Sequence, residues 1–541
     1  MTLEREVNPN STWTGMNNQS GVSRSVWMAT SEVEPHAQLR RDETADVCVI
    51  GAGIAGMTTA YLLASEGKTV VVLDDGPIGG GETGRTTAHL SNALDDRYFE
   101  IERLHGSDGL RLAAESHTAA ISRIEAIVNS EKIDCDFERL DGYLFVPPGE
   151  RLDVLDRELA AAHRAGLPEV ILVERAPLAF NTGPCLKFQR QGQFHPLKYL
   201  SGLSLAIKRL GGRIFTFTHA ENIEGGSSAC VATKDGPVVS ARDIVVATNT
   251  PVNNLVAIHT KQAAYRSYVI GITVPAGSVT RALFWDTGEP YHYLRLDRMG
   301  ANKDSKNADE VLIVGGEDHK VGQADDTARR YERLEEWSRE RFPSAGQVQF
   351  RWSGQVMETI DGLAYIGHNP LDEPNVYIVT GDSGMGMTHS TIAGIVLTDL
   401  IVGRDNRWAE LYDPSRKRVQ AAASFVRENL NAVAQYADQL TGGEVDSPDE
   451  VAAGSGGVVR RGLSKVAVYR DQQGVLHERS AVCPHMGCVV RWNGGEETWD
   501  CPCHGSRFDP YGHVLNGPAI TDLPQAEPVQ SDDRSARKAA R

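Results

Sequence analysis

Cysteine and histidine are concentrated in one short window near the C-terminus. Four of the eight cysteines lie between residues 483 and 503. The pattern is Cys483-x-His485, then fifteen residues, then Cys501-x-x-His504. Two thiolates and two imidazoles on two short loops could bind tetrahedral zinc, and the same ligand types also bind iron–sulfur clusters. The window therefore predicts a metal centre with mixed sulfur and nitrogen ligands.

Two further cysteines, Cys488 and Cys503, lie beside these ligand candidates and argue against zinc. Their spacing, the segment CPCHGSRFD and the downstream NGPA loop resemble the Rieske [2Fe-2S] family. The resemblance implies a disulfide between Cys488 and Cys503 that ties the two cluster loops together. It also implies four cluster ligands: Cys483 and Cys501 on one iron, His485 and His504 on the other.

The same resemblance bears on the redox potential of the cluster. Ser506 matches a position whose hydroxyl hydrogen-bonds a cluster sulfur in high-potential relatives, but Phe508 stands where those relatives carry a tyrosine. One hydrogen-bond donor is kept and one is missing. We therefore expect a potential in the middle of the Rieske range.

A dinucleotide fingerprint lies near the other end of the chain. Residues 46–75 read as an apolar strand, a glycine turn, a helix and a second strand that ends in acid. Gly51, Gly53 and Gly56 have the GxGxxG spacing, which suits a tight turn, close approach of a pyrophosphate and close packing of helix on strand. Asp74 ends the second strand, where it can bind ribose hydroxyls. The other predicted dinucleotide contacts are Ile54, Ala55 and Asp75.

Three further segments resemble the D-amino acid oxidase and sarcosine oxidase superfamily of FAD enzymes. They are GPIGGGETGRTTAHLSNAL, ARDIVVATNTP, and the closing pair WSGQVMETIDGLAYIG and NVYIVTGDSGMGMTHSTIAGIVLTDLI. The resemblance spans residues 44–439 and implies FAD as the cofactor. Carried over residue by residue, it implies flavin-site contacts at Gly84, Arg85, Thr86, Thr87, Ala88, His89, Ala220, Ala247, Thr248, Gly381, Gly384, Met385, Gly386, Met387 and Thr388.

Two of these positions carry a more specific expectation. An apolar helix is predicted to begin near Thr388, directly after the glycine loop at 381–386. The positive end of such a helix points back at the loop, where it can stabilise negative charge on a reduced flavin. His89 is a candidate for covalent flavin attachment because some relatives use a histidine, although it stands a few positions later than in their pattern.

Substrate contacts are predicted on two segments rich in polar aromatic residues, KQAAYRSYVIG and EPYHYLRLD. In the superfamily such strands often supply an arginine or tyrosine that binds the substrate carboxylate. We predict Arg266 and Tyr293 as catalytic residues. A half-exposed antiparallel strand would show the same alternation.

Oxidation of a C–N bond in an amine or amino acid is what the superfamily implies. The sequence carries no second fingerprint for NAD(P)H, so the organic substrate should supply the electrons. We expect a dehydrogenase in which FADH2 passes electrons to the Rieske cluster and on to an external acceptor, a protein or a quinone. A non-catalytic redox sensor or an electron-transfer reductase is the alternative. A Rieske oxygenase is disfavoured because the sequence lacks a closely spaced histidine pair for mononuclear iron.

Composition restricts the partners. The net charge of −17 opposes binding to nucleic acid or to an anionic membrane surface. No apolar run is long enough for a membrane span. The other cysteines are scattered singly, which predicts a reducing, cytoplasmic compartment: Cys48, Cys135, Cys185 and Cys230. A helical stretch at 421–440 leaves a homo-oligomer open.

The predicted fold combines three parts. An α/β (α+β) Rossmann-type FAD-binding domain contains an antiparallel substrate sheet, and a small all-β Rieske domain follows it. The predicted ranges are an N-terminal tail (1–43), the flavoprotein (44–440, with nucleotide-binding parts at about 44–95, 200–255 and 350–405), a linker (441–457), the Rieske domain (458–525) and a disordered tail (526–541).

Overall fold

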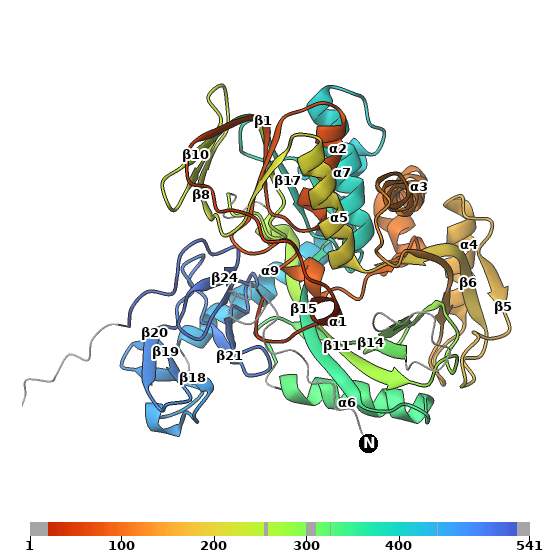
Figure 1. Cartoon of the computed structure of the whole chain (residues 1–541). Coiled ribbons are helices and arrows are strands. Elements are labelled where there is room, and N and C mark those ends of the chain that lie inside the picture. The colour runs from red at the N-terminus through yellow and green to blue at the C-terminus, as the bar shows by residue number, and fades with distance from the viewer. Residues whose placement is uncertain (1–19, 254–257, 299–309, 325, 441, 527–541) are drawn as a thin grey trace, which may run out of the picture.

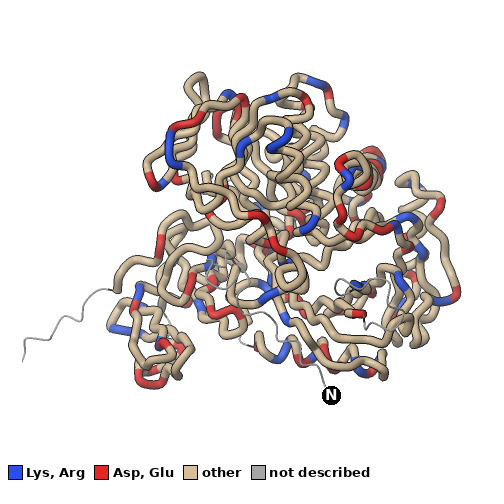
Figure 2. The backbone as a smooth tube through the Cα atoms, in the orientation of Figure 1, with Lys and Arg blue, Asp and Glu red and all other residues tan. Residues whose placement is uncertain are grey.

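The computed structural model describes residues 20–253, 258–298, 310–324, 326–440 and 442–526 (Figure 1). Beyond residue 526, the predicted C-terminal tail lies outside these ranges. In the part of the chain that the structure describes, no helix combines the length and apolar character needed to cross a lipid bilayer. Acidic and basic residues are interspersed along the chain (Figure 2).

The dinucleotide fingerprint opens a sheet whose central strands are parallel. Their order is β16-β17-β10-β1-β2-β7, and β16 runs antiparallel to β17. The strands are β1 (Glu43–Ile50), β2 (Val70–Leu73), β7 (Arg213–Phe215), β8 (Ala220–Glu224), β9 (Cys230–Thr233), β10 (Val238–Val246), β16 (Tyr365–His368) and β17 (Val376–Thr380). The helices α2 (Ile54–Ser65), α5 (Pro196–Arg209) and α7 (Gly386–Val402) pack together on it. Because this sheet is buried, β2 and β17 read as continuous apolar runs.

The second large sheet is mainly antiparallel and has the order β15-β11-β14-β13-β12-β4-β6-β3, with β5 beside β6. Its strands are β3 (His89–Leu90), β4 (Glu138–Phe145), β5 (Ile171–Val173), β6 (Cys185–Gln193), β11 (Gln262–Val274), β12 (Leu283–Asp286), β13 (His292–Asp297), β14 (Glu310–Lys320) and β15 (Val348–Thr359). The helix α6 (Thr327–Arg341) covers β11 and β14. Helices α3 (Tyr98–Glu131) and α4 (Asp153–Arg164) pack against each other.

Two small sheets form the C-terminal domain. The first contains β18 (Ser455–Arg461), β19 (Ser464–Arg470) and β20 (Leu476–Ser480), and the second contains β21 (Arg491–Asn493), β22 (Thr498–Asp500), β23 (Arg507–Phe508) and β24 (Val514–Asn516). The two loops that carry the Cys/His pattern follow β20 and β22. After α8 (Ala409–Tyr412), the helix α9 (Ala422–Tyr436) leads into this domain, and the Tyr436 hydroxyl donates to the Met486 carbonyl at 2.7 Å.

The described part of the predicted N-terminal tail, residues 20–43, packs into the protein. Its short helix α1 (Val26–Thr30) places Trp27 in the main core, fully buried. The Trp27 indole donates to the Thr86 carbonyl at 2.6 Å, and the Ser25 hydroxyl donates to the Gly84 carbonyl at 2.5 Å. This segment therefore supports the loop predicted to contact the flavin.

The candidate flavin cavity and cluster site

A cavity of about 840 Å³ opens where the carboxyl ends of β1, β2, β10 and β17 meet the second sheet. Ligands in parallel α/β sheets bind at this edge. Most of the predicted dinucleotide and flavin residues line it: Gly51, Gly53, Ile54, Ala55, Asp74, Asp75, Arg85, Thr86, Thr87, His89, Ala220, Ala247, Thr248, Gly381, Gly384, Met385, Gly386 and Met387. These positions come from six separate segments, so the fold brings the predicted set together.

The glycines of the fingerprint have steric roles. Gly51 has a φ of +107°, and a Cβ there would collide with the Ala247 carbonyl. A Cβ at Gly56 would collide with the Gly51 carbonyl, so Gly56 allows α2 to approach β1 and does not line the cavity. At the end of β2, Asp74 accepts from the Ala52 amide at 2.5 Å and from the Gly76 amide at 2.8 Å. The strand–turn–helix unit thus fits a dinucleotide with the geometry that its spacing predicts.

Three other predicted contacts lie outside the cavity wall. Gly84 packs under the Gly79 carbonyl, and Ala88 is fully buried. The Thr388 hydroxyl is also buried, 2.8 Å from the His117 imidazole. Helix α7 begins at Gly386, two residues before the position that we expected. These three residues lie behind the flavin loops in the described cavity, and their contacts with the flavin stay predictions.

The structure corrects the prediction for Arg266. On β11, Tyr265 and Ser267 line the cavity, whereas the intervening Arg266 is fully buried on the other side of the strand. Its guanidinium donates to the Ser353 hydroxyl at 2.5 Å. Arg266 therefore does not line the described cavity. Tyr293 does line the cavity, and its hydroxyl lies 2.7 Å from the Ser267 hydroxyl.

His89 lies in the cavity wall, edge-on to Tyr293 with 5.7 Å between ring centroids. Burial, and then the charge of Arg295, lowers the pKa of His89 to about 3. The imidazole is therefore neutral at physiological pH. A neutral ring is the form that could attach covalently to a flavin, and this attachment stays a prediction.

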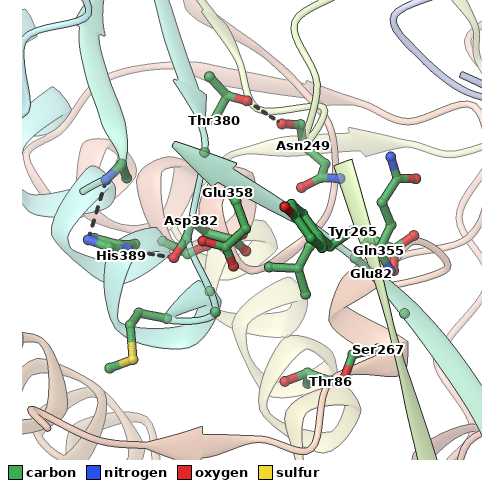
Figure 3. A pocket seen from close by; sticks show the side chains of 18 of the residues that line it. Glu82, Thr86, Asn249, Tyr265, Ser267, Gln355, Glu358, Thr380, Asp382 and His389 are labelled. Atoms are coloured by element: carbon green, nitrogen blue, oxygen red, sulfur yellow. Dashed lines mark hydrogen bonds between the residues drawn. The ribbon is translucent and has the colours of Figure 1, made fainter. Parts of the chain in front are cut away.

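A group of carboxylates is the feature of the cavity that the sequence pattern did not signal. We call five of the acids that line the cavity the carboxylate cluster: Asp95, Asp96, Asp318, Glu358 and Asp382. Burial raises the pKa of Asp318 and of Asp382 to about 7. Burial and the neighbouring carboxylates raise the pKa of Glu358 well above its usual range. Figure 3 shows Glu358 and Asp382 in the cavity wall with Tyr265.

The four predicted cluster ligands lie on the two loops and pair by type, thiol with thiol and ring with ring. Cys483 and Cys501 are buried, and a hydrogen bond from the Cys501 side chain lowers the pKa of Cys483. The rings of His485 and His504 lie 4.9 Å apart, almost perpendicular. The loops are joined by the Cys488–Cys503 disulfide, with 6.4 Å between its Cα atoms.

The ligand chemistry fits a Rieske cluster. The Nδ1 atom of His504 is buried and has no hydrogen-bond partner among the described residues, which suits a nitrogen that binds a metal. Burial lowers the pKa of His504 to about 4, so the ring is in the neutral form that ligation requires. The Ser506 side chain hydrogen-bonds Cys483 and also accepts from the Ala519 amide at 3.0 Å. The donor predicted from the sequence is thus in place beside a cluster ligand.

The C-terminal domain forms part of the flavin cavity. Asn516, Gly517 and Ala519 of the NGPA loop line it. On the opposite side, Gln355 of β15 lines the cavity, and its amide donates to the Gly505 carbonyl, next to His504, at 3.1 Å. The two sites therefore share a wall.

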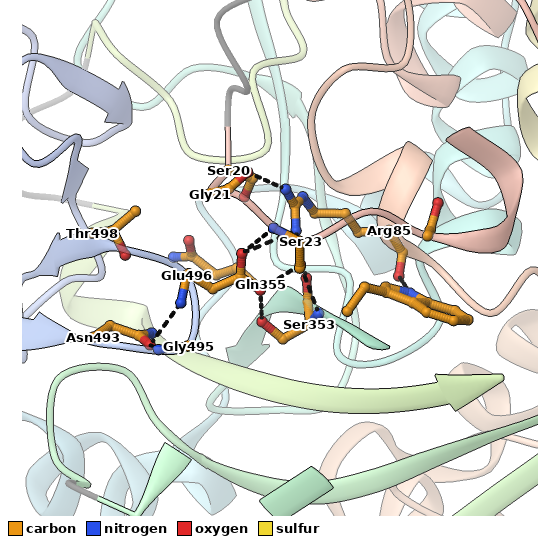
Figure 4. A network of polar contacts seen from close by, with 12 residues as sticks. Ser20, Gly21, Ser23, Arg85, Ser353, Gln355, Asn493, Gly495, Glu496 and Thr498 are labelled. Carbon is orange, nitrogen blue, oxygen red and sulfur yellow. Dashed lines mark hydrogen bonds and ion pairs between the residues drawn. The ribbon is translucent and has the colours of Figure 1, made fainter. Parts of the chain in front are cut away.

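A buried ion cluster holds the two parts together (Figure 4). Glu496, only 1% exposed, lies in the C-terminal domain, 3.5 Å from Arg85 and 3.6 Å from Arg266 of the flavoprotein. It also accepts from the Ser23 hydroxyl at 2.6 Å. We call the buried charged residues at this contact the interface cluster: Arg85, Arg266, Arg507, Glu496 and Asp500. The guanidinium of Arg85 forms its ion pair within this cluster, with Glu496.

Comparison with known proteins identifies both parts. The model of the FAD dependent oxidoreductase family matches residues 46–400. The chain belongs to this family. The Rieske [2Fe-2S] domain model matches residues 443–527. The oxidoreductase is therefore an FAD enzyme with a Rieske cluster, and the predicted family, fold class and cofactors are confirmed.

Relatives of this oxidoreductase include proteins with both parts and with one. The putative Rieske 2Fe-2S iron-sulfur protein YhfW of Bacillus subtilis (strain 168) is 31% identical over 508 residues, which cover 93% of this chain and 97% of the relative. Gamma-glutamylputrescine oxidoreductase of Escherichia coli (strain K12) is 28% identical over 399 residues, which cover 70% of this chain and 89% of the relative. The structure of glycine oxidase from Geobacillus kaustophilus has a TM-score of 0.58 at 17% identity, covering 69% of this chain and 99% of that one. It shows the common fold.

Proposed function

We propose that this oxidoreductase is a dehydrogenase that oxidises a C–N bond of an amine or amino acid, with the electrons passed from FADH2 through the Rieske cluster to an external acceptor. The shared wall between the cavity and the cluster loops carries this proposal. Ala519 lines the cavity, and its amide donates a hydrogen bond to the Ser506 hydroxyl. The Ser506 side chain in turn hydrogen-bonds the predicted cluster ligand Cys483. Oxidation and electron removal can therefore take place within one chain.

When bound, FAD supplies a two-electron acceptor and the cluster a one-electron relay. The protein binds the amine and manages its proton. An ammonium group must lose a proton before its C–N bond can be oxidised, and a carboxylate with a raised pKa is a suitable acceptor near neutral pH. Asp318, with a pKa of about 7, lines the cavity and accepts a hydrogen bond from the Tyr291 hydroxyl at 3.1 Å. The interface cluster links the two domains through buried ion pairs.

Anaerobic titration of the purified holoprotein with a panel of amines and amino acids tests this proposal. We expect the flavin absorbance to bleach and the EPR signal of a reduced Rieske cluster to follow. In a Cys501→Ser variant, bleaching should persist while the EPR signal is lost. If no organic substrate bleaches the flavin but NADH or NADPH does, the protein is an electron-transfer reductase. If nothing in either group reduces it, the redox-sensor alternative gains support. The acceptor, a homo-oligomer and the cytoplasmic location stay predictions.

A further inference from the structure

The charge of the cavity wall indicates what kind of substrate it binds. The carboxylate cluster draws its members from four separate segments of the chain, and they repel one another, since the pKa of Glu358 is raised by burial and then by the charges of Asp96 and Asp95. One carboxylate oxygen of Asp318 and one of Asp382 are buried without a hydrogen-bond partner among the described residues. Buried carboxylates are costly unless a cation or hydrogen-bond donor faces them. The wall therefore favours a ligand that brings a cation or a hydrogen-bond donor.

The arginines of the cavity wall do not fully compensate the cluster: the charge of Arg97 lowers the pKa of Asp95 and of Asp96, but burial still raises both. Each of the four already has acceptors of its own: Arg85 with Glu496, Arg97 with the Leu94 and Asp286 carbonyls, Arg103 with Glu100, and Arg427 with Glu428. Arg266, which we expected to bind a substrate carboxylate, faces the interface cluster. The four arginines that line the described cavity thus already have acceptors from the chain, with which a substrate carboxylate would compete.

Tyrosine rings stand beside the carboxylates. Tyr291 and Tyr293 are stacked with 5.5 Å between ring centroids, and both line the cavity together with Tyr265. The Tyr291 hydroxyl donates to Asp318. Aromatic faces next to carboxylates are the surroundings that bind alkylammonium groups, because the ring quadrupole and the anion attract the same cation.

We propose that the substrate is a cationic alkylamine without a carboxylate, whose ammonium group binds between the carboxylate cluster and the three tyrosines. This inference rests on the proposed function and narrows it from amines and amino acids to amines. A substrate carboxylate would enter a wall that already carries five carboxyl groups, and its negative charge would be repelled by those that are ionised. A diamine offers a second cation to the same cluster.

Four related compounds test the inference on the holoprotein: butylamine, 1,4-diaminobutane, 4-aminobutanoate and ornithine. In 4-aminobutanoate a carboxylate replaces the methyl group of butylamine, and ornithine is 1,4-diaminobutane with an added carboxylate. Flavin bleaching is followed anaerobically. We expect the two amines to half-saturate the reduction at concentrations at least tenfold lower than their carboxylate-bearing partners, with the diamine best. If ornithine or 4-aminobutanoate reduces the flavin better than the amines do, the inference fails while the proposed function stands. If none of a broad amine and amino acid panel reduces it, the proposed function fails.

Charge recognition can be measured without turnover. Butyltrimethylammonium carries the cation but has no nitrogen lone pair to form a C=N bond, so it should shift the flavin spectrum on binding and never bleach it. Asp318→Asn and Glu358→Gln should each weaken this binding about tenfold. Glu340→Gln, which alters a carboxylate with 74% of its side chain exposed on α6, should leave it unchanged. Equal binding of butyltrimethylammonium and butanoate, or full affinity in both cavity variants, would overturn the inference.

Discussion

The interface cluster and the carboxylate cluster both gather acids inside the protein, but the charges of arginines outweigh burial only in the first. Burial by itself would raise the pKa of Glu496, yet the charges of Arg85, Arg266 and Arg507 outweigh it and the pKa is lowered. Asp500 behaves in the same way beside Arg507 and Arg266. In the cavity, burial dominates, and the pKa of Asp95 rises to about 6 and that of Asp96 to about 7.

The difference separates structural from functional acids. A buried carboxylate whose cation comes from the chain fixes one part of the fold to another. One for which burial outweighs the charges of the chain costs stability, and a cationic ligand that binds beside it lowers that cost. The direction of the pKa shift, together with the neighbouring charges, thus indicates which acids link the domains and which are available to bind a ligand.

The largest effect should come from removing the central acid of the interface cluster. Glu496→Gln leaves three buried arginines with less negative charge, and breaking such a buried pair costs about 3–5 kcal/mol. Chemical denaturation followed by the visible circular dichroism of the Rieske cluster should show this loss. Asp449→Asn removes an acid of the same domain whose side chain is 93% exposed, and the midpoint should not move. Equal midpoints for Glu496→Gln and the parent protein would mean that the cluster does not hold the domains.

Arg266→Gln should have a smaller effect, because Arg85 and Arg507 still compensate Glu496. We expect a loss of about 1–3 kcal/mol, the usual cost of leaving buried partners short of a hydrogen bond. The amine concentration that half-saturates flavin reduction should stay unchanged, whereas Tyr293→Phe, on the cavity wall, should raise it severalfold. A large change in half-saturation for Arg266→Gln with unaltered stability would restore its predicted role at the substrate.

The two clusters should respond to pH with opposite signs. Asp318 has a folded pKa of about 7 against an ordinary value of 3.8, so the folded state binds the extra proton. Its contribution to stability is therefore fully present below pH 3.8 and falls as the pH rises to about 7. The pKa of Glu496 is lowered, so its contribution is present above the ordinary value of 4.5 and falls only as the pH drops below it.

Thermal unfolding in amine-free buffers across this range measures the contrast. Relative to the parent protein, Asp318→Asn should gain stability as the pH rises, and 1,4-diaminobutane should stabilise the parent more at the higher pH. Parallel curves for the two proteins would show that Asp318 does not hold a proton in the cavity.

The sequence predicted those parts of the site that local spacing determines. The GxGxxG motif forms its turn from residues that are neighbours along the chain, and the Cys/His pattern occupies two loops within 22 residues. It was harder to predict which face of β11 points to the cavity. Alternation along a strand shows that Arg266 and Tyr265 face opposite sides of the sheet, but not which side is the cavity. The carboxylate cluster and the contact of Ser23 with Glu496, 473 positions apart, depend on tertiary packing of distant segments. Single acids and serines carry no local pattern that signals such a meeting.

An exposed ion pair should show the smallest effect and so define the limit of the comparison. Arg164 of α4 makes a two-point contact with Glu102 of α3, with Nε 2.9 Å from one carboxylate oxygen, and both side chains reach solvent. The hydrogen bonds from Arg164 lower the pKa of Glu102, the same direction as at Glu496. Water screens the pair, however, so Arg164→Gln should cost no more than about 1 kcal/mol. If its unfolding midpoint falls as far as that of Glu496→Gln, burial is not what gives the interface cluster its strength. The direction of the pKa shift would then be the remaining difference between the acids of the interface cluster and those of the carboxylate cluster.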